Sequence, residues 1–353
     1  MDKISFILPC RNEKQAIKKV IQDIQSTCRK ENVKNYEIIV SDSSWDGSDK
    51  IAINQGAKLV KHDQKGYGLA LQKGIDKAQY ETIIFGDPDG SYDFKEFPKL
   101  IKKLKNSDIV LGNRLKGNIE KKAMPFTHRF IGTPLLNLLL KILFSIKISD
   151  SQSGFRAFKK SSFKKLNLQT NGMEFASEMI IQATKNGLKI KEIPIDYKIR
   201  KGDSKLEPYK DGFAHIKYII LKAPFIFYLI TGGIIIIIGT ISLFLGNQIG
   251  NIFETATFKI FFPIIGLEII FLGLFSKTYL YTKLNQENKF LKKFYKIFSL
   301  KHAIFISIIF LLIPIIFKIL NLDQNYFNQL FVSAIFGIQI IFNSIYLSEL
   351  SIK

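Results

Sequence analysis

Short apolar runs alternate with helix-like segments along the first 200 residues of the chain. The runs have the length of buried strands, and the segments between them repeat apolar residues at i, i+3 and i+4. The runs cover residues 4–8, 37–40, 58–60, 82–85 and 108–111, and the helix-like segments cover 13–28, 68–78 and 94–104. This alternation predicts an α/β domain over residues 1–207, with a mainly parallel sheet and helices on both of its faces.

The pattern changes near residue 223, where isoleucine, phenylalanine and leucine begin to dominate. Four apolar segments beyond this point are long enough, or nearly so, to cross about 30 Å of hydrocarbon. They cover residues 224–246, 260–281, 303–320 and 327–347. The sequence therefore predicts a four-helix transmembrane domain over 224–353, following the α/β domain.

Lysines between the spans indicate how the chain crosses the membrane. Residues 283–301, after the second span, hold six lysines and one glutamate, whereas the connections after the first and third spans hold only Lys259. The positive-inside rule places the lysine-rich connection in the cytosol, and with four spans both termini lie there too. We expect a multi-pass integral membrane protein with a cytosolic α/β domain.

Glu268 lies inside the second predicted span. An acid within the membrane is a candidate functional residue. The alternative is a packing residue that is hydrogen-bonded or protonated, and the sequence leaves both readings open.

Two segments of the first half combine cations with apolar faces. Residues 126–146 carry His128 and Arg129 near their start and are then rich in leucine, and residues 208–223 are basic and aromatic. Both patterns are typical of helices that lie in the membrane interface. The first segment could instead be a fifth span, although its proline and lysine argue against that.

The composition narrows the classes of ligand. The formal net charge is +21, and only ten of the 51 lysines and arginines follow residue 223. A basic domain beside a membrane suits anionic headgroups and phosphorylated substrates better than nucleic acid. Two cysteines are too few for a disulfide framework, and the four histidines lack the spacing of zinc ligands.

Carboxylates gather where the apolar run 82–85 ends, at Asp87, Asp89 and Asp93. Loops at the carboxyl ends of parallel strands line the ligand sites of open α/β sheets. We expect Asp87 and Asp89 to be ligands of a hard divalent cation, which also binds a phosphate of the substrate. Asp93 is left out of this set because it could cap the helix that begins at residue 94.

The glycine pattern excludes two other phosphate-binding designs. The first strand is followed by Pro-Cys-Arg-Asn-Glu, which has no glycine, and the run that starts at Gly66 and Gly68 lacks the third glycine of a dinucleotide fingerprint. Neither the dinucleotide motif nor a P-loop is present in this sequence. Asp87 and Asp89, acting through a bound cation, are therefore the remaining candidates for binding phosphates.

Seven short motifs occur in the order and spacing of one known family. ILPCRNE, IIVSDSSWDGS, GDPDGSYDF and LGNR resemble the nucleotide-sugar domain of family 2 glycosyltransferases, which have a GT-A fold. DSQSGFRAF, GMEFASEM and RKGDSKL are similar to the polyprenyl-phosphate glycosyltransferases, the group of dolichol-phosphate mannose synthase and undecaprenyl-phosphate glucosyltransferases. The resemblance covers about residues 3–222.

The resemblance implies transfer of a sugar from a nucleotide sugar to a polyprenyl phosphate, with Mg²⁺ or Mn²⁺ as cofactor. We expect inversion, with UDP-glucose as leading donor and GDP-mannose next. The resemblance implies that the donor nucleotide is contacted by Pro9, Asn12, Glu13, Asp42 and Asp87. It also implies that the metal is bound by Asp87, Asp89 and Ser91. Ser41 stands where an aspartate is common in the family. The carboxylate of Asp42 could accept a hydrogen bond from a ring N–H of either uracil or guanine, so the identity of the base is only weakly determined.

The acceptor side needs cations, because a phosphate must be oriented there. The positions considered for it are Arg114, Arg129, Thr133, Arg200, Lys201 and Lys205, and the catalytic candidates are Asp150 and Arg114. Asp150 either orients the acceptor and shares its proton or bonds a nearby backbone turn, and these readings have equal weight.

Other functions fit the sequence less well. A processive polysaccharide synthase would carry a Gln-x-x-Arg-Trp motif, but Trp45, the one tryptophan, lies in the donor loop. A non-catalytic membrane scaffold would have no need to keep both Asp87 and Asp89. The expected partners are therefore a nucleotide sugar, a polyprenyl phosphate and the membrane. The sugar, the lipid and the oligomeric state, including a homo-oligomer, stay open.

Overall fold

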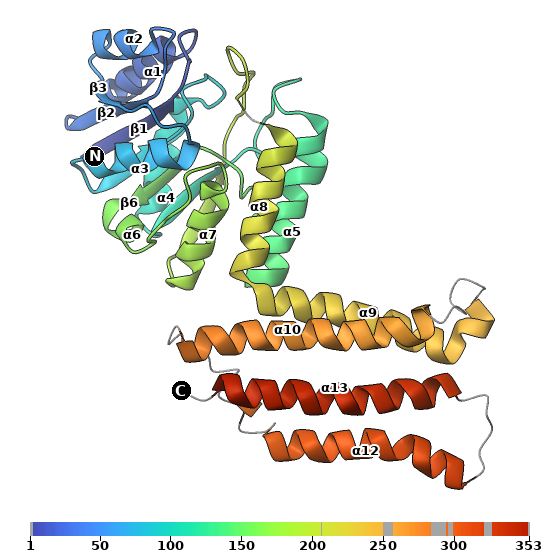
Figure 1. Ribbon diagram of the computed structural model, residues 1–353. Coiled ribbons are helices and arrows are strands. Elements are labelled where there is room, and N and C mark those ends of the chain that lie inside the picture. The colour runs from blue at the N-terminus through green and yellow to red at the C-terminus, as the bar shows by residue number, and fades with distance from the viewer. Residues whose placement is uncertain are drawn as a thin grey trace. The chain divides into compact units, whose positions relative to one another are not determined.

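The protein divides into two compact units, Met1–Leu221 and Lys222–Lys353, in a computed structural model (Figure 1). The first unit is an α/β domain, and the second consists of long helices. The structure describes residues 3–205, 207–249, 257–283, 294–295, 299–320 and 327–351.

Seven strands of the described residues form one sheet in the order β3-β2-β1-β4-β6-β5-β7. The strands are β1 (Ile4–Cys10), β2 (Tyr36–Asp42), β3 (Lys58–Lys61), β4 (Thr82–Phe85), β5 (Ile109–Asn113), β6 (Arg156–Lys159) and β7 (Ile190–Pro194). Only β6 runs antiparallel to its neighbours, β4 and β5. The mainly parallel sheet is confirmed, and its first five strands coincide with the five apolar runs. The strands β6 and β7 were not predicted.

Helices cover both faces of the sheet, as the sequence predicts. Those of the first unit are α1 (Ile17–Lys30), α2 (Ser48–Asn54), α3 (Tyr67–Lys77), η1 (Phe94–Glu96), α4 (Phe97–Leu104), η2 (His128–Gly132), α5 (Thr133–Phe144), α6 (Lys160–Lys164), α7 (Phe175–Lys185) and α8 (Pro208–Lys222). Side chains alternate along β1, because successive residues of a strand point to opposite faces. Phe6 and Leu8 join the core formed with α1 and α4, whereas Ile7 packs against Gly74 of α3.

The pairing of β1 brings the loops of the site together. Cys10 lies opposite Asp42 in the parallel neighbour β2, and Ile7 lies opposite Phe85 in the parallel neighbour β4. The carboxyl ends of these three strands therefore meet at one edge of the sheet. The predicted donor residues lie at these strand ends and in the loops that follow them.

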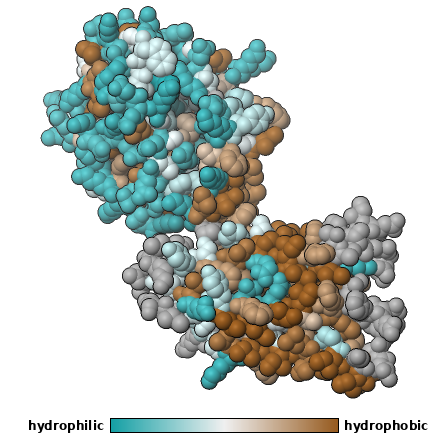
Figure 2. All heavy atoms as spheres, in the orientation of Figure 1, coloured by the Kyte–Doolittle hydropathy of each residue, from teal (hydrophilic) through white to brown (hydrophobic). Residues whose placement is uncertain are grey.

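The second unit contains α9 (Pro224–Ile249), η3 (Thr257–Phe261), α10 (Phe262–Lys283), α12 (Leu300–Ile319) and α13 (Phe327–Ser351). By length and composition, four of these described segments could cross a membrane: Phe225–Phe244, Lys259–Tyr279, Leu300–Phe317 and Leu330–Ser351. Their surface is mostly hydrophobic (Figure 2). The predicted four helices are confirmed, whereas most of the lysine-rich connection 283–301 lies outside the described residues.

Glycines let α9 and α10 approach each other backbone to backbone. A Cβ placed on Gly232 would lie 2.5 Å from the carbonyl oxygen of Gly266, and one on Gly239 would lie 2.3 Å from the Pro263 ring. Small residues are common where membrane helices pack, because dispersion contacts hold such helices together. The two helices therefore depend on these positions for their contact.

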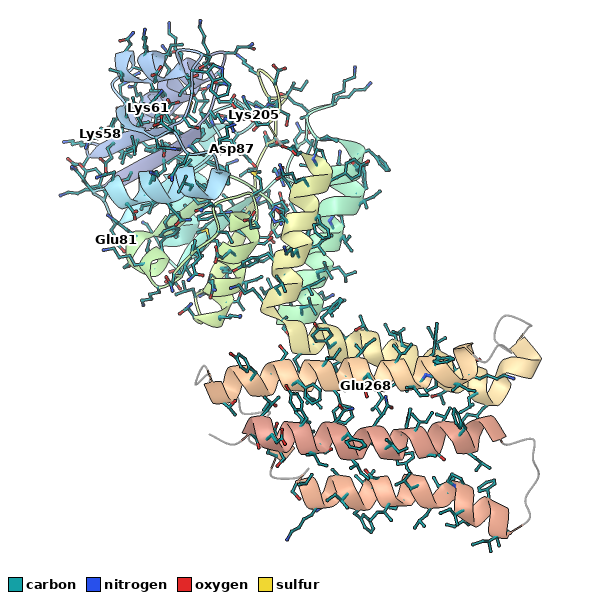
Figure 3. The ribbon with its side chains drawn as sticks, in the orientation of Figure 1. Lys58, Lys61, Glu81, Asp87, Lys205 and Glu268 are labelled. Atoms are coloured by element: carbon teal, nitrogen blue, oxygen red, sulfur yellow. The ribbon has the colours of Figure 1, made fainter. Side chains whose placement is uncertain are left out.

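Glu268 of α10 is hydrogen-bonded to α13 (Figure 3). Its Oε1 accepts from Gln339 Nε2 at 2.8 Å and from Asn343 Nδ2 at 2.9 Å. These amide donors support the reading of Glu268 as a packing residue between two helices of the second unit.

A leucine at position 232 should weaken the contact of α9 with α10. Overpacking of a tight contact costs about 1–3 kcal/mol, so Gly232→Leu should unfold at a lower temperature than the wild type in the same detergent. The neighbouring Gly233→Leu is the matched control, because a Cβ at Gly233 would meet nothing within 4 Å. Equal unfolding temperatures for the two variants would contradict this packing.

Candidate active site

Asp42 ends β2 as a fully buried carboxylate. Its Oδ1 accepts from the Ser44 hydroxyl at 2.5 Å, and its Oδ2 accepts from Lys61 Nζ at 2.7 Å (Figure 3). Lys61, the last residue of β3, also bonds Asp49 at 2.9 Å. A buried charge needs a partner of opposite sign, and Lys61 supplies it. The sequence reasoning missed this lysine, whose only signal was its place at the end of a strand.

The loop after β1 is bonded to the loop after β2. Asn12 has a positive φ of 57° and its N–H donates to the Ser44 hydroxyl at 2.7 Å, while the Glu13 N–H donates to the Ser48 hydroxyl at 2.9 Å. Pro9 lies within β1, one position before its end. The structure therefore brings the four predicted nucleotide residues of these two strands and their loops to one edge of the sheet.

Asp87 and Asp89 follow β4 in a tight turn. The Ser91 N–H and hydroxyl both donate to Asp89 Oδ1, at 2.9 and 2.5 Å, so Ser91 points at a carboxylate and not away from it. Burial, and next the negative charge of Asp89, raise the pKa of Asp87 to about 7. Two carboxylates that disfavour each other's charge form a place where a cation binds well.

The residues present fit a divalent cation whose ligands come partly from the protein and partly from a substrate. No group of three or more His, Cys, Asp or Glu side chains in the described part of the chain could hold a metal alone. Mg²⁺ is commonly bound through one or two carboxylates, with phosphate oxygens and water completing its shell. Asp87 and Asp89 match that pattern.

Asp93 has a different role from its two neighbours. Its Oδ1 accepts from the Lys95 N–H at 3.0 Å, which caps η1, and its Oδ2 accepts from Lys198 Nζ at 2.7 Å. The structure therefore agrees with leaving Asp93 out of the ligand set.

The segment 198–205 crosses the acid loop and contacts the donor side. Arg200 lies 3.2 Å from Glu13 Oε1 and 3.5 Å from Asp89 Oδ2, and Lys205 Nζ lies 2.8 Å from Glu13 Oε1. Burial raises the pKa of Glu13, and Lys205 opposes this rise. In the structure Arg200 and Lys205 are paired with donor-side acids, and their contact with lipid phosphate stays a prediction.

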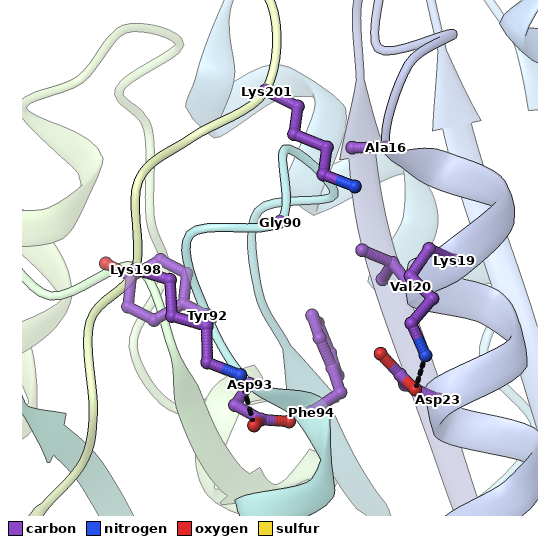
Figure 4. Close-up of a pocket in the computed structure, with 10 residues that line it drawn as sticks. All are labelled: Ala16, Lys19, Val20, Asp23, Gly90, Tyr92, Asp93, Phe94, Lys198 and Lys201. Atoms are coloured by element: carbon purple, nitrogen blue, oxygen red, sulfur yellow. Dashed lines mark hydrogen bonds and ion pairs between the residues drawn. The ribbon is translucent and has the colours of Figure 1, made fainter. Parts of the chain in front are cut away.

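Lys201 lines a cavity of about 170 Å³ beside the acid loop (Figure 4). The cavity lies between α1, the turn at Gly90 and the segment 198–201. Two more of its lysines are paired already, Lys19 with Asp23 at 2.6 Å and Lys198 with Asp93 at 2.7 Å. The charges of this cavity largely neutralise each other.

Arg114 and Asp150, the two predicted catalytic residues, hold each other. Arg114 Nε and Nη2 donate to the two Asp150 oxygens at 2.8 Å each, and the Arg114 backbone N–H donates to Asp150 Oδ2 at 2.9 Å. Asp150 is fully buried, and the guanidinium also lies over the Tyr197 ring at 5.2 Å. These bonds support the structural reading of Asp150. The lipid-phosphate role of Arg114 stays a prediction, and in the structure its Nε and Nη2 donate to a carboxylate.

Arg129 lies exposed on η2, with its guanidinium 5.2 Å from the centre of the Phe130 ring. Thr133, the predicted neighbour in phosphate binding, is 5% exposed at the start of α5. The surrounding apolar side chains point outwards: Phe126, Phe130, Ile131, Leu135, Leu138 and Ile142 are 42–69% exposed. We call this surface the η2–α5 face. Apolar residues also gather in Figure 2 where α5 and α8 lie in the first unit.

Side-chain hydrogen bonds fix α5 and α8 to the rest of the first unit. Asn137 of α5 donates to the Ser149 carbonyl at 2.6 Å and accepts from the Ser151 N–H at 3.1 Å. His215 of α8 bonds Ser177 at 2.8 Å, and Tyr218 bonds Glu178 at 3.0 Å. η2 and α5 together hold seventeen residues, and they are not among the four segments of the described chain that are long and apolar enough to cross a membrane.

The comparisons with known proteins agree with this geometry. Residues 5–167 match the family Glycosyl transferase family 2. The low-salt glycan biosynthesis hexosyltransferase Agl6 of Haloferax volcanii is 35% identical over 254 residues, 70% of this chain and 61% of its own length. A UDP-N-acetylglucosamine–dolichyl-phosphate N-acetylglucosaminyltransferase of Methanococcus voltae is 32% identical over 243 residues, 59% of this chain and 93% of its own.

A solved structure shows the same GT-A fold. Glucosyl-3-phosphoglycerate synthase from Mycobacterium tuberculosis, in complex with Mn²⁺, UDP and glucosyl-3-phosphoglycerate, superposes with a TM-score of 0.51. The two proteins are 21% identical, and the match covers 63% of this chain and 80% of that one. This likeness establishes the fold of the first unit.

Asp150→Asn should destabilise the protein, because it leaves the Arg114 charge buried without a counter-ion. Breaking a buried pair costs about 3–5 kcal/mol, and the thermal unfolding of the full chain measures the loss. The control is Asp76→Asn, at an exposed aspartate of α3. Replacing both partners, with Arg114→Met and Asp150→Leu, should recover part of the stability. Wild-type stability of Asp150→Asn together with lost activity would favour the catalytic reading instead.

Proposed function

Because the chain belongs to glycosyl transferase family 2, we propose that it transfers a sugar from a nucleoside-diphosphate sugar to a polyprenyl phosphate. The observation that carries the proposal is the pair of half-buried Asp87 and buried Asp89 at the same sheet edge as Asp42. The first unit also presents the exposed, apolar η2–α5 face with Arg129 upon it. A water-soluble donor and a lipid acceptor require these two kinds of surface.

Asp42 and the loop around Asn12 would bind the nucleoside. An aspartate carboxylate accepts a hydrogen bond from a ring N–H, and the contact with Lys61 orients the carboxylate of Asp42. UDP-glucose is the leading donor and GDP-mannose the next. The relative from Methanococcus voltae, which is named for a UDP-sugar, supports uridine over guanosine.

Asp87 and Asp89 would hold Mg²⁺ or Mn²⁺ through their carboxylates. A divalent cation supplies positive charge for the diphosphate that departs from the sugar. Arg200, which lies 3.5 Å from Asp89, adds a further positive charge at this place. The acid pair and the segment 198–205 together would position the donor.

The acceptor needs alignment more than it needs a base. A phosphate monoester is largely ionised at neutral pH, its second pKa being about 6. Its oxygen would attack the anomeric carbon opposite the departing diphosphate, which inverts the configuration without a covalent intermediate. Arg129 is the cation proposed to bind this phosphate, because it is exposed on an apolar face.

The reaction would take place at the cytosolic side of a membrane. The lysine distribution around the predicted spans supports that side. The exposed phenylalanines and leucines of the η2–α5 face would lie among the lipid headgroups, as apolar faces of interfacial helices do. The two named relatives support the chemistry, since one is a hexosyltransferase and the other is named for dolichyl phosphate.

A panel of radiolabelled UDP- and GDP-sugars with polyprenyl phosphate tests the activity. We expect one sugar to become extractable into organic solvent, with activity lost in EDTA. Asp89→Asn should lower the rate on the order of 100-fold or more, equivalent to about 2.7 kcal/mol of transition-state stabilisation. Asp93→Asn is the matched control, because Asp93 caps η1. Full activity of Asp89→Asn in chelator, or a product that keeps the donor's anomeric configuration, would refute the mechanism.

Arg129→Ala should raise KM for the lipid phosphate and leave nucleotide-sugar binding unchanged. A hydrogen bond to a charged group contributes about 1.5–3 kcal/mol, which corresponds to roughly tenfold or more in KM. Asp42→Asn should do the reverse, weakening nucleotide binding measured by calorimetry. Arg29→Ala, at an exposed arginine of α1, is the control. Loss of donor binding in Arg129→Ala would show that the two sites are wrongly divided.

A further inference from the structure

Tyr67, the first residue of α3, carries a buried hydroxyl that has no hydrogen bond of ordinary geometry among the described residues, and the Asp87 carboxylate is the acceptor that lies near it. A buried hydroxyl without a partner costs about 1–3 kcal/mol. A phenol is neutral at pH 7, since its ordinary pKa is about 10, so the Tyr67 proton is available for donation beside Asp87.

Gly154 brings the Tyr67 hydroxyl and the Asp87 carboxylate together. A Cβ on this glycine would lie 2.6 Å from Asp87 Oδ2 and 3.0 Å from the Tyr67 hydroxyl oxygen. Both oxygens thus pack against the same bare stretch of backbone. The Gly154 N–H donates to the Tyr92 hydroxyl at 2.7 Å, which fixes that stretch.

The buried guanidinium of Arg156 restrains the loop that contains Gly154. Its Nε and Nη2 donate to the carbonyls of Ser153 and Ser151, at 2.9 Å each, and its Nη1 donates to the Ala176 carbonyl at 3.1 Å. A fully buried cation that donates to carbonyls at several places restrains them all. The backbone at Gly154, which packs against Asp87, is therefore held in place.

The start of α3 is fixed as firmly as the loop. A Cβ on Gly66 would lie 2.3 Å from the Asn171 carbonyl oxygen, and one on Gly68 would lie 2.6 Å from the Thr170 carbonyl oxygen. The N–H of Gly68 donates to the Gly172 carbonyl at 3.2 Å. Only glycines allow this close approach, so they anchor Tyr67 between them and set the direction of its ring.

We propose that the Tyr67 hydroxyl donates a hydrogen bond to Asp87 Oδ2 when this carboxylate binds the divalent cation of the donor. Tyr67 is then a positioning residue, which orients a ligand without touching the cation itself. The inference rests on the proposed function, because it takes Asp87 as a cation ligand. A phenol suits this place because it donates without adding a positive charge, whereas a lysine would repel the cation.

Groups that hydrogen-bond a metal ligand from behind have a measurable effect. Losing one typically lowers metal affinity about 10–100-fold. Tyr67→Phe removes the hydroxyl and keeps the ring, so it isolates this bond. Tyr80→Phe, at a half-buried tyrosine outside the site, is the matched control.

The experiment is a titration of the full-length protein in detergent with Mn²⁺ in the presence of UDP. Free Mn²⁺ is measured by electron paramagnetic resonance, and the unfolding temperature is measured on the same samples. We expect the Kd for Mn²⁺ to rise about 10–100-fold in Tyr67→Phe and to stay unchanged in Tyr80→Phe. In turnover assays, saturating Mn²⁺ should restore most of kcat in Tyr67→Phe, because only the affinity is lowered.

Each other outcome has a distinct meaning. Wild-type protein that binds no Mn²⁺ would refute the metal role in the proposed function. Tight Mn²⁺ binding by the wild type and equally tight binding by Tyr67→Phe would overturn the role of Tyr67 alone. Tyr67→Leu removes the ring as well, so a loss of affinity seen only in that variant would assign the effect to packing and would also overturn the inference.

Discussion

The parallel pairing of β1 with both β2 and β4 is the constraint on which the candidate site depends. It sets Cys10 opposite Asp42 and Ile7 opposite Phe85, so three loops leave the sheet at one edge. A serine hydroxyl joins the loops after β1 and β2: Ser44 bonds both Asp42 and the Asn12 N–H. A shift of register by one residue would turn every side chain of β1 to the other face.

Buried carboxylates of the site differ in how their charge is balanced. Asp42 is paired with Lys61, Asp150 with Arg114, and Glu13 with Lys205. Asp87 has no ion pair within 4 Å among the described residues, and its pKa is the one that burial and a like charge raise to about 7. The protein thus balances these three acids with its own cations and leaves Asp87 to a proton or an external cation.

A continuous set of contacts links α8 to the acid pair within the first unit. Tyr218 of α8 bonds Glu178 of α7, and Glu178 accepts from the Thr170 N–H at 2.8 Å. The Thr170 carbonyl packs on Gly68, next to Tyr67 at the start of α3. The glycines that fail as a dinucleotide motif therefore serve a different purpose, the close packing that directs Tyr67 towards Asp87.

The sequence by itself determined the features that depend on local pattern. Apolar periodicity predicted the first five strands and four long helices, and the spacing of the acids marked the turn after β4 and the cap at Asp93. Only the tertiary structure decided which charges meet. Asp150 and Arg114 are 36 residues apart, and Lys205 and Glu13 are 192 apart. A charged side chain carries no information about its partner until the chain folds, because the same arginine can serve a phosphate in solution or a carboxylate in the interior.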